Sequence, residues 1–181
     1  DVTLITKGEN ISYAGCGLPY YVGGVIENKS DLIVNTPKSF SDLTQVEVKT
    51  GIEALSIDRN KKIVNAINLN NNEEVKFNYD KLVIATGADP VKPPIEGIDL
   101  EGVYYMRTPN DAIAVREVVE NDNVKRAVVV GGGFIGLEVA ENLHEMGVKT
   151  TLVEAMDHIM PGFDDEVCSY VEDELMENGI M

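Results

Sequence analysis

The sequence predicts an α/β fold, and three observations along the chain lead to this prediction. Apolar and polar residues alternate in parts of residues 46–85, as they do in half-buried strands. Beyond residues 88–98, which are rich in proline and glycine, strand-like runs alternate with helix-like segments. A glycine cluster joins one of these apolar runs directly to the helical segment that follows it. With 44% hydrophobic and 25% charged residues among 181, the composition is that of a globular chain.

Local patterns place the individual elements. Thr36-Pro37 is typical of an N-cap followed by proline at the first helical position, and Thr108-Pro109 begins another helix in the same way. The continuous apolar run 82–85 predicts a buried strand. The expected strands are 2–5, 46–50, 62–69, 74–79, 82–85, 126–130 and 149–153. The expected helices are 37–43, 109–120, 134–147 and 164–178.

The chain is strongly acidic, with a formal net charge of -16 from 31 acidic and 15 basic residues. Nucleic acids and anionic membranes are bound by clustered Lys and Arg, so we expect neither as a partner. The two cysteines, Cys16 and Cys168, and the two histidines lack the spacing of metal ligands, so we expect no metal site. Because no signal peptide or long apolar run is present, we expect a cytoplasmic protein. Both ends read as cuts, so we also expect a piece of a longer protein.

Residues 126–154 predict a dinucleotide-binding unit of the Rossmann type. The Gly-x-Gly-x-x-Gly motif made by Gly131, Gly133 and Gly136 follows an apolar strand and leads at once into a helix. Gly131 permits the tight turn, Gly133 lets a pyrophosphate approach the backbone, and Gly136 allows close packing of helix and strand. A second strand ends in Glu154, which is placed to bind the adenosine ribose hydroxyls. A carboxylate there repels a 2'-phosphate, so NADH is favoured over NADPH.

Cys16 is the candidate reactive residue. Pro19 suits a first helical turn, which puts Cys16 near a helix N-terminus, where partial positive charge stabilises a thiolate. The small neighbours Gly15 and Gly17 leave the sulfur accessible. A lone cysteine is also commonly structural, so the residues alone leave both roles open.

The chain resembles the single-cysteine branch of the pyridine nucleotide-disulfide oxidoreductases, which includes coenzyme A-disulfide reductases, NADH oxidases and NADH peroxidases. The resemblance lies in four segments that occur in this order, namely 11–24 around Cys16, 79–88, 93–97 and 128–141. It implies that residues 1–103 are part of an FAD-binding domain that carries the redox cysteine and an inserted antiparallel β-meander. Residues 104–181 would be the first half of an NAD-binding domain, and the complete protein would be a homodimer.

The resemblance also implies roles for single residues. Cys16 would cycle between a thiol and either a mixed disulfide or a sulfenic acid. Phe134 would gate the nicotinamide pocket and Glu138 would lie near the nicotinamide and flavin, although helix packing and a capping charge explain these two residues equally well. The implied contacts of FAD are Lys7, Ser12, Ala85, Thr86, Gly87 and Arg107, and Ile135 is a further implied cofactor contact.

The function implied by the resemblance is electron transfer from NADH through FAD to Cys16 and on to a small disulfide, such as coenzyme A disulfide or polysulfide. Two alternatives stay open: an oxidase or peroxidase that uses oxygen or peroxide, and a nucleotide-binding fragment that catalyses nothing. The chain departs from the family pattern at Thr6, where an acid usually binds the FAD ribose, and at Gly15, where coenzyme A-disulfide reductases can carry Asn. It also lacks the family's first strand and glycine turn, so we expect the chain alone to bind FAD poorly.

Overall fold

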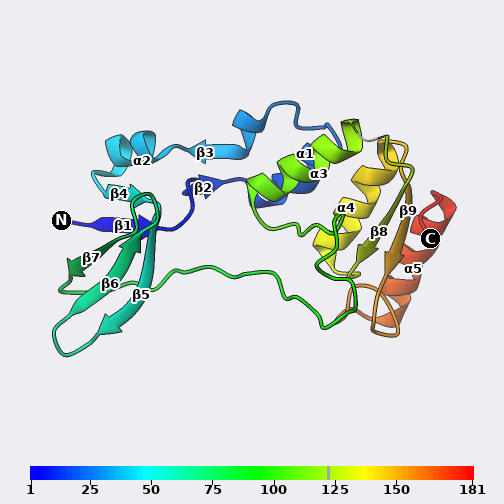
Figure 1. Ribbon diagram of the computed structural model, residues 1–181. Coiled ribbons are helices and arrows are strands. Elements are labelled where there is room, and N and C mark those ends of the chain that lie inside the picture. Colours follow the sequence, from blue (N-terminus) through cyan, green and yellow to red (C-terminus); the bar gives the residue numbers. More distant parts are fainter. Residues whose placement is uncertain (122) are drawn as a thin grey trace. The chain divides into compact units, whose positions relative to one another are not determined.

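The computed structural model describes residues 1–121 and 123–181, which form two compact units (Figure 1). The first unit contains Asp1–Tyr13 and Ile33–Asp89, and the second contains Ala14–Leu32 and Pro90–Met181. Both units mix helices and strands, as the predicted α/β fold requires. No helix in the described residues has the length and apolar character needed to cross a membrane.

The first unit is built from short strand pairs, one helix and a three-stranded sheet. Strands β1 (Thr3–Thr6) and β4 (Glu47–Thr50) pair in parallel, and β2 (Ser12–Tyr13) pairs antiparallel with β3 (Ile33–Asn35). Helix α2 (Pro37–Thr44) begins with the predicted cap, because Thr36 Oγ1 accepts from the Ser39 N–H at 3.1 Å while Ser39 Oγ accepts from the Thr36 N–H at 2.9 Å. The predicted helix is therefore confirmed to within one residue.

The predicted β-meander is present as three antiparallel strands in the order β5-β6-β7 (Figure 1). Their bounds are β5 (Ile52–Asp58), β6 (Ile63–Asn68) and β7 (Glu73–Asn78). In the central strand Val64 and Ala66 are buried, which follows the period of two expected for a sheet with one covered face. Asn72 adopts a left-handed conformation with φ of 58° in the β6–β7 turn, a conformation that asparagine tolerates well.

The strand predicted at residues 82–85 is not formed, and the prediction was wrong on this point. Val83 is 85% and Ile84 69% exposed, and the segment is extended without ladder hydrogen bonds (Figure 1). Within the described residues no strand pairs with it. A strand needs a neighbour to satisfy its N–H and C=O groups, so an apolar run alone cannot make one.

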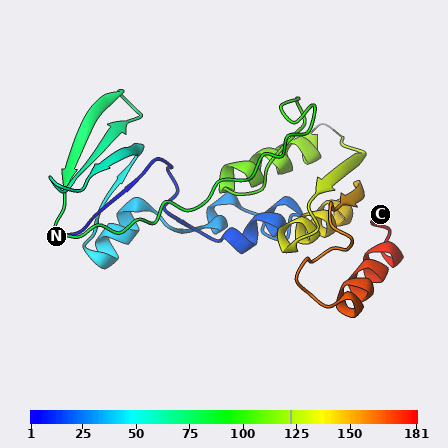
Figure 2. The same cartoon turned by 90° about the horizontal axis from the view of Figure 1, so that it is seen from below.

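In its described residues, the second unit joins a two-stranded parallel sheet to four α-helices. Strands β8 (Arg126–Val130) and β9 (Lys149–Val153) lie in register, with Val129 opposite Leu152. The helices are α1 (Leu18–Val22), α3 (Pro109–Asn121), α4 (Phe134–Glu145) and α5 (Asp165–Glu177). In Figure 2 they are blue, green, yellow and red in this order. Helix α4 ends two residues earlier than predicted because Gly147 turns the chain with φ of 81°.

The core of the second unit lies on one face of this sheet. Ala127 and Val129 of β8 pack against a core that includes Val139 and Leu143 of α4. Val128 and Val130 point the other way and are 65% and 66% exposed, so this apolar strand is buried on one face only. Cys168 of α5 is fully buried beside Ile159 and Met160, so this cysteine is a core residue. The C-terminal Met181 also pairs with β9, since its N–H donates to Thr150 and its carbonyl accepts from Leu152.

Candidate nucleotide-binding and thiol site

The turn between β8 and α4 has the geometry that its glycines predict. Gly131 has φ of 115°, a conformation that other residues rarely adopt, and its N–H donates to Val153 O at 2.8 Å. A Cβ atom on Gly136 would lie 1.9 Å from Gly131 O, so the first helical turn rests directly on the glycine turn. The third glycine is therefore required by close backbone packing, as predicted.

Gly133 lies on the open side of the same turn. It is the N-cap of α4, it is exposed, and a Cβ atom there would meet nothing within 4 Å. The first-turn N–H groups of a helix lack partners within the helix, and they form an anion site together with the helix dipole. An open glycine in front of such groups fits a pyrophosphate that must approach the backbone closely.

Glu154 at the end of β9 is held by three backbone donors. Its Oε2 accepts from the Gly132 N–H at 2.6 Å, and its Oε1 accepts from the Ala155 N–H at 2.7 Å and from the Met156 N–H at 2.9 Å. These hydrogen bonds, that from Met156 first and that from Gly132 next, hold the pKa of the Glu154 carboxyl below its usual value. The carboxylate is therefore charged and fixed beside the glycine turn.

Gly132 is a site residue that sequence reasoning missed, because the motif leaves its position variable. A Cβ atom on this buried residue would lie 2.8 Å from Ile159 Cγ2 and 3.2 Å from Glu154 Oε2. Its carbonyl accepts from the Met160 N–H at 2.8 Å. Gly132 thus joins the turn, the Glu154 carboxylate and the loop after β9 into one structure.

The predicted cofactor contacts on α4 lie where the helix begins. Phe134 is 61% and Ile135 58% exposed, while Glu138 one turn later is half-buried. The Phe134 ring meets the Phe163 ring edge to face, with 5.7 Å between centroids and 89° between planes. The sequence did not predict this contact with Phe163. The nicotinamide roles of Phe134 and Glu138 stay predictions.

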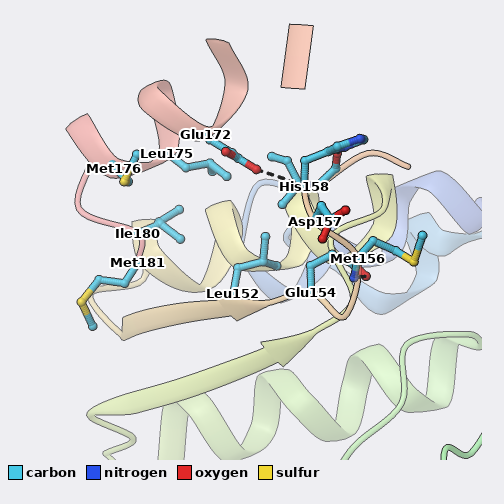
Figure 3. A pocket seen from close by; sticks show the side chains of 11 residues that line it. Leu152, Glu154, Met156, Asp157, His158, Glu172, Leu175, Met176, Ile180 and Met181 are labelled. Atoms are coloured by element: carbon cyan, nitrogen blue, oxygen red, sulfur yellow. Dashed lines mark hydrogen bonds between the residues drawn. The ribbon is translucent and has the colours of Figure 1, made fainter. Parts of the chain in front are cut away.

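A cavity of about 270 Å³ lies beside Glu154, between the end of β9 and α5 (Figure 3). Its apolar residues come from both elements and from the C-terminus, and its polar residues include three carboxylates. The lining residues are Leu152, Glu154, Met156, Asp157, His158, Ile159, Glu172, Leu175, Met176, Ile180 and Met181. The Ile159 N–H donates to Glu172 Oε1 at 3.2 Å and ties the loop to α5.

Cys16 is an exposed free thiol in the 3₁₀ turn η1 (Gly15–Gly17), immediately before α1. Pro19 lies in the first turn of α1, as predicted. The space around Gly15 is open, but Gly17 is buried and its Cβ would lie 2.9 Å from Ile26 Cδ1. Glycine at position 17 therefore serves packing against Ile26, whereas the sequence suggested that it serves access to the sulfur.

The structure groups some of the predicted site residues and separates others. Cys16 and Arg107 share the second unit with the glycine turn and Glu154, whereas the other predicted flavin contacts lie in the first unit. These first-unit residues are Lys7, Ser12, Ala85, Thr86 and Gly87. Residues 85–87 present an exposed backbone that suits contact with a ligand, and Gly87 has φ of 72°. The flavin contacts remain predictions.

Comparison with known proteins shows the family of the chain. The profile of the family described as "Pyridine nucleotide-disulphide oxidoreductase" matches residues 1–181. An NADH oxidase of Methanocaldococcus jannaschii is 35% identical over 99% of this chain and 40% of its own length. A coenzyme A disulfide reductase of Staphylococcus haemolyticus is 31% identical over 97% of this chain and 39% of its own length.

A solved structure agrees with these sequence matches. The structure of an NAD-dependent persulfide reductase from A. fulgidus matches with a TM-score of 0.94 and 40% identity, over 99% of this chain and 34% of that one. The chain thus spans about two fifths or less of the length of these proteins. Proteins of this family are flavin-dependent and use NAD(P)H. Since the family profile matches the whole chain, and the glycine turn and Glu154 have the geometry described above, the chain belongs to the pyridine nucleotide-disulphide oxidoreductase family.

Proposed function

We propose that this chain binds NADH and supplies the redox-active thiol of an FAD-dependent oxidoreductase that reduces a small disulfide. The observation that carries the proposal is the presence of the exposed thiol of Cys16 in the same compact unit as the glycine turn and Glu154. The likeness to a coenzyme A disulfide reductase and to a persulfide reductase supports a sulfur compound as the electron acceptor.

The nucleotide would be held by the turn and by the end of β9. The open backbone at Gly133 and the start of α4 would bind the pyrophosphate. The fixed carboxylate of Glu154 would accept hydrogen bonds from the ribose and repel a 2'-phosphate, so NADH is preferred to NADPH. Phe134 would lie at the nicotinamide end of the nucleotide.

The thiol chemistry is carried by Cys16. Its thiolate attacks one sulfur of the acceptor RSSR, so that the S–S bond breaks, a mixed disulfide forms and RS⁻ leaves to take a proton. When bound, FAD supplies the two-electron connection between NADH and sulfur. Two electrons and one proton then release the second RSH and restore the Cys16 thiolate. The sum is NADH + H⁺ + RSSR → NAD⁺ + 2 RSH.

A second candidate keeps the same enzyme class and changes the acceptor to oxygen or peroxide, with a sulfenic acid at Cys16. The 35% identity to an NADH oxidase is the observation in its favour. A third candidate is a nucleotide-binding module without catalysis. We further propose a cytoplasmic homodimer that binds neither nucleic acid nor membrane, in keeping with the net charge of -16.

Replacement of Cys16 by Ser in the complete, FAD-loaded protein tests the proposal. We expect disulfide reduction with NADH to fall to background, because a serine hydroxyl does not form a mixed disulfide, while NADH binding is unchanged. Cys168→Ala is the matched control: this buried thiol has no role in turnover, so activity should persist. Full disulfide reduction by the Cys16→Ser protein would refute the proposal. Loss of NADH-dependent peroxide reduction with no disulfide reduction in either protein would favour the second candidate.

A further inference from the structure

Helix α1, which begins two residues after Cys16, packs between two other helices of the second unit. Leu18 and Val22 of α1 are buried with Ala112 of α3 and Leu143 of α4 in one core. Because Cys16 directly precedes α1, whatever fixes α1 also fixes the thiol relative to α4, the helix that begins at the glycine turn. The contacts that hold α1 are therefore relevant to the thiol.

Arg116 of α3 makes several polar contacts with the chain in and after α1. Its Nη1 donates to the carbonyls of Tyr21, Ile26 and Glu27 at 3.1, 2.9 and 3.2 Å. Its Nε donates to Glu120 Oε1 at 2.7 Å, and the guanidinium lies 4.6 Å from the centroid of the Tyr21 ring. The Arg116 side chain is 17% exposed, so these contacts are largely shielded from water.

These contacts have a clear physical role. A helix of five residues such as α1 is not stable by itself. The Tyr21 carbonyl near its C-terminal end accepts from the Gly24 N–H at 3.2 Å, and as a carbonyl it can accept from a second donor. Arg116 is that second donor, and its charge complements the helix dipole. Its contacts with the Ile26 and Glu27 carbonyls hold the chain that follows α1. Only arginine combines a planar fork with stacking on an aromatic ring, so lysine cannot reproduce the arrangement.

A second contact presses the same end of α1 against α4. A Cβ atom on Gly23 would lie 2.1 Å from Asn142 Oδ1, so the two helices meet there without room for a side chain. Asn142 is 4% exposed and its Nδ2 donates to the Glu138 carbonyl at 2.8 Å. The end of α1 is thus bounded by Arg116 on α3 and by Asn142 on α4.

We propose that Arg116 is a positioning residue for Cys16. By holding the chain at Tyr21, Ile26 and Glu27, it keeps α1 seated on α4 and fixes the distance between the thiol and the dinucleotide turn. The catalytic meaning of this distance rests on the proposed function, whereas the distance itself can be measured without any activity.

Electron paramagnetic resonance on a doubly labelled chain tests this directly. Spin labels are attached to Cys16 and to Val128→Cys, an exposed position on β8, while the buried Cys168 stays unlabelled under native conditions. We expect a narrow distance distribution in the parent and a width increased roughly two-fold in Arg116→Met, because α1 loses its anchor. Arg116→Lys should fall between the two. In the complete, FAD-loaded protein, Arg116→Lys should lower kcat for disulfide reduction and leave the KM for NADH unchanged.

Two matched variants separate this role from general destabilisation. Arg126→Met removes an exposed arginine of β8, and Glu120→Gln removes the ion pair but keeps the three carbonyl contacts, so both should leave the distribution narrow. An unchanged width in folded Arg116→Met would overturn the inference. If Arg116→Met does not fold, Arg116→Lys is measured in its place. A distance distribution as narrow as that of the parent in Arg116→Lys would also overturn the inference. These distance measurements need no enzyme activity, whereas the proposed function is tested by the activity of Cys16→Ser. Failure of one proposal can therefore be told apart from failure of the other.

Discussion

At the scale of one residue, the Glu154 carboxylate is fixed in the position where we propose that it binds the ribose of NADH. Three backbone N–H groups, from Gly132, Ala155 and Met156, fix its carboxylate. A carboxylate already ordered does not lose conformational freedom when a ribose binds, so more of the binding energy is retained. The same hydrogen bonds lower the pKa of Glu154, which makes its contribution to stability dependent on pH.

Glu154→Gln should weaken NADH binding, and it should change how the free energy of unfolding depends on pH. One oxygen of the carboxylate becomes an NH₂ group that cannot accept from a backbone N–H, so NADH affinity should fall by roughly 10- to 100-fold. The preference for NADH over NADPH should shrink because the charge that repels a 2'-phosphate is gone. Calorimetric titration with NADH and NADPH measures both effects, and an unchanged preference would contradict the assignment of Glu154.

The pH dependence has a definite sign. Because the folded-state pKa is lowered from the ordinary carboxyl value of 4.5, the stabilisation by Glu154 is complete above that value and is lost as pH falls through the folded-state pKa. The difference in unfolding free energy between the parent and Glu154→Gln should therefore be constant at neutral pH and shrink below pH 4.5. Urea unfolding at several pH values measures it, and a difference that grows toward low pH would contradict this prediction.

At the scale of the element, the unit from β8 to α4 uses its glycines for two different purposes. Gly136 is needed because the helix backbone rests on the carbonyl of Gly131, whereas Gly133 faces open space. The first is a requirement of folding, and we infer that the second serves nucleotide binding. The motif alone does not separate these requirements, because both positions are simply glycine.

The pair Gly136→Ala and Gly133→Ala tests this division. Gly136→Ala should cost about 1–3 kcal/mol of unfolding free energy, because the added methyl forces the turn and helix apart. Gly133→Ala should change stability by less than about 0.5 kcal/mol, since φ there is -78° and the space is open. It should nevertheless weaken NADH binding, because its methyl lies where the pyrophosphate approaches. Equal losses of stability in the two variants would argue against the division.

At the scale of the whole molecule, the predicted parts of the site are divided between two compact units. The thiol, Arg107 and the glycine turn belong to the second unit, and five of the predicted flavin contacts belong to the first. The apolar run at residues 82–85 is exposed and lacks a partner strand among the described residues. Residues 85–87 at its end are therefore not held by a sheet, which would be needed to fix their backbone along a flavin.

We expect this chain alone to bind NADH but to hold FAD poorly. After purification in the presence of excess FAD and gel filtration, the protein should be nearly colourless, with little flavin absorbance in the visible range. The same sample should still bind NADH, because the glycine turn and Glu154 lie together in the second unit. A yellow protein with one FAD per chain would show that the first unit holds the flavin without a sheet at residues 82–85.

Much of the architecture could be predicted from the sequence because the signals are local. The cap Thr36-Pro37, the β-meander around residues 70–72 and the strand–glycine–helix unit at Gly131 each depend on neighbouring residues, and each is present. The run at residues 82–85 was predicted wrongly because burial of a strand depends on a partner that its own residues do not encode. The sequence analysis assigned Gly17 to access of the Cys16 sulfur, whereas the structure shows that it makes room for Ile26, which lies nine residues further along the chain.

The sequence by itself determined the fold class, the dinucleotide turn with Glu154 at the end of the second strand, and Cys16 as the candidate thiol. Tertiary structure alone decided that Gly132 seats the Glu154 carboxylate, that Phe163 meets Phe134, and that Arg116 holds the helix after Cys16. The physical reason is sequence separation. Periodicity and caps act between residues a few positions apart, whereas Arg116 and Ile26 are 90 positions apart and meet when α1 packs against α3.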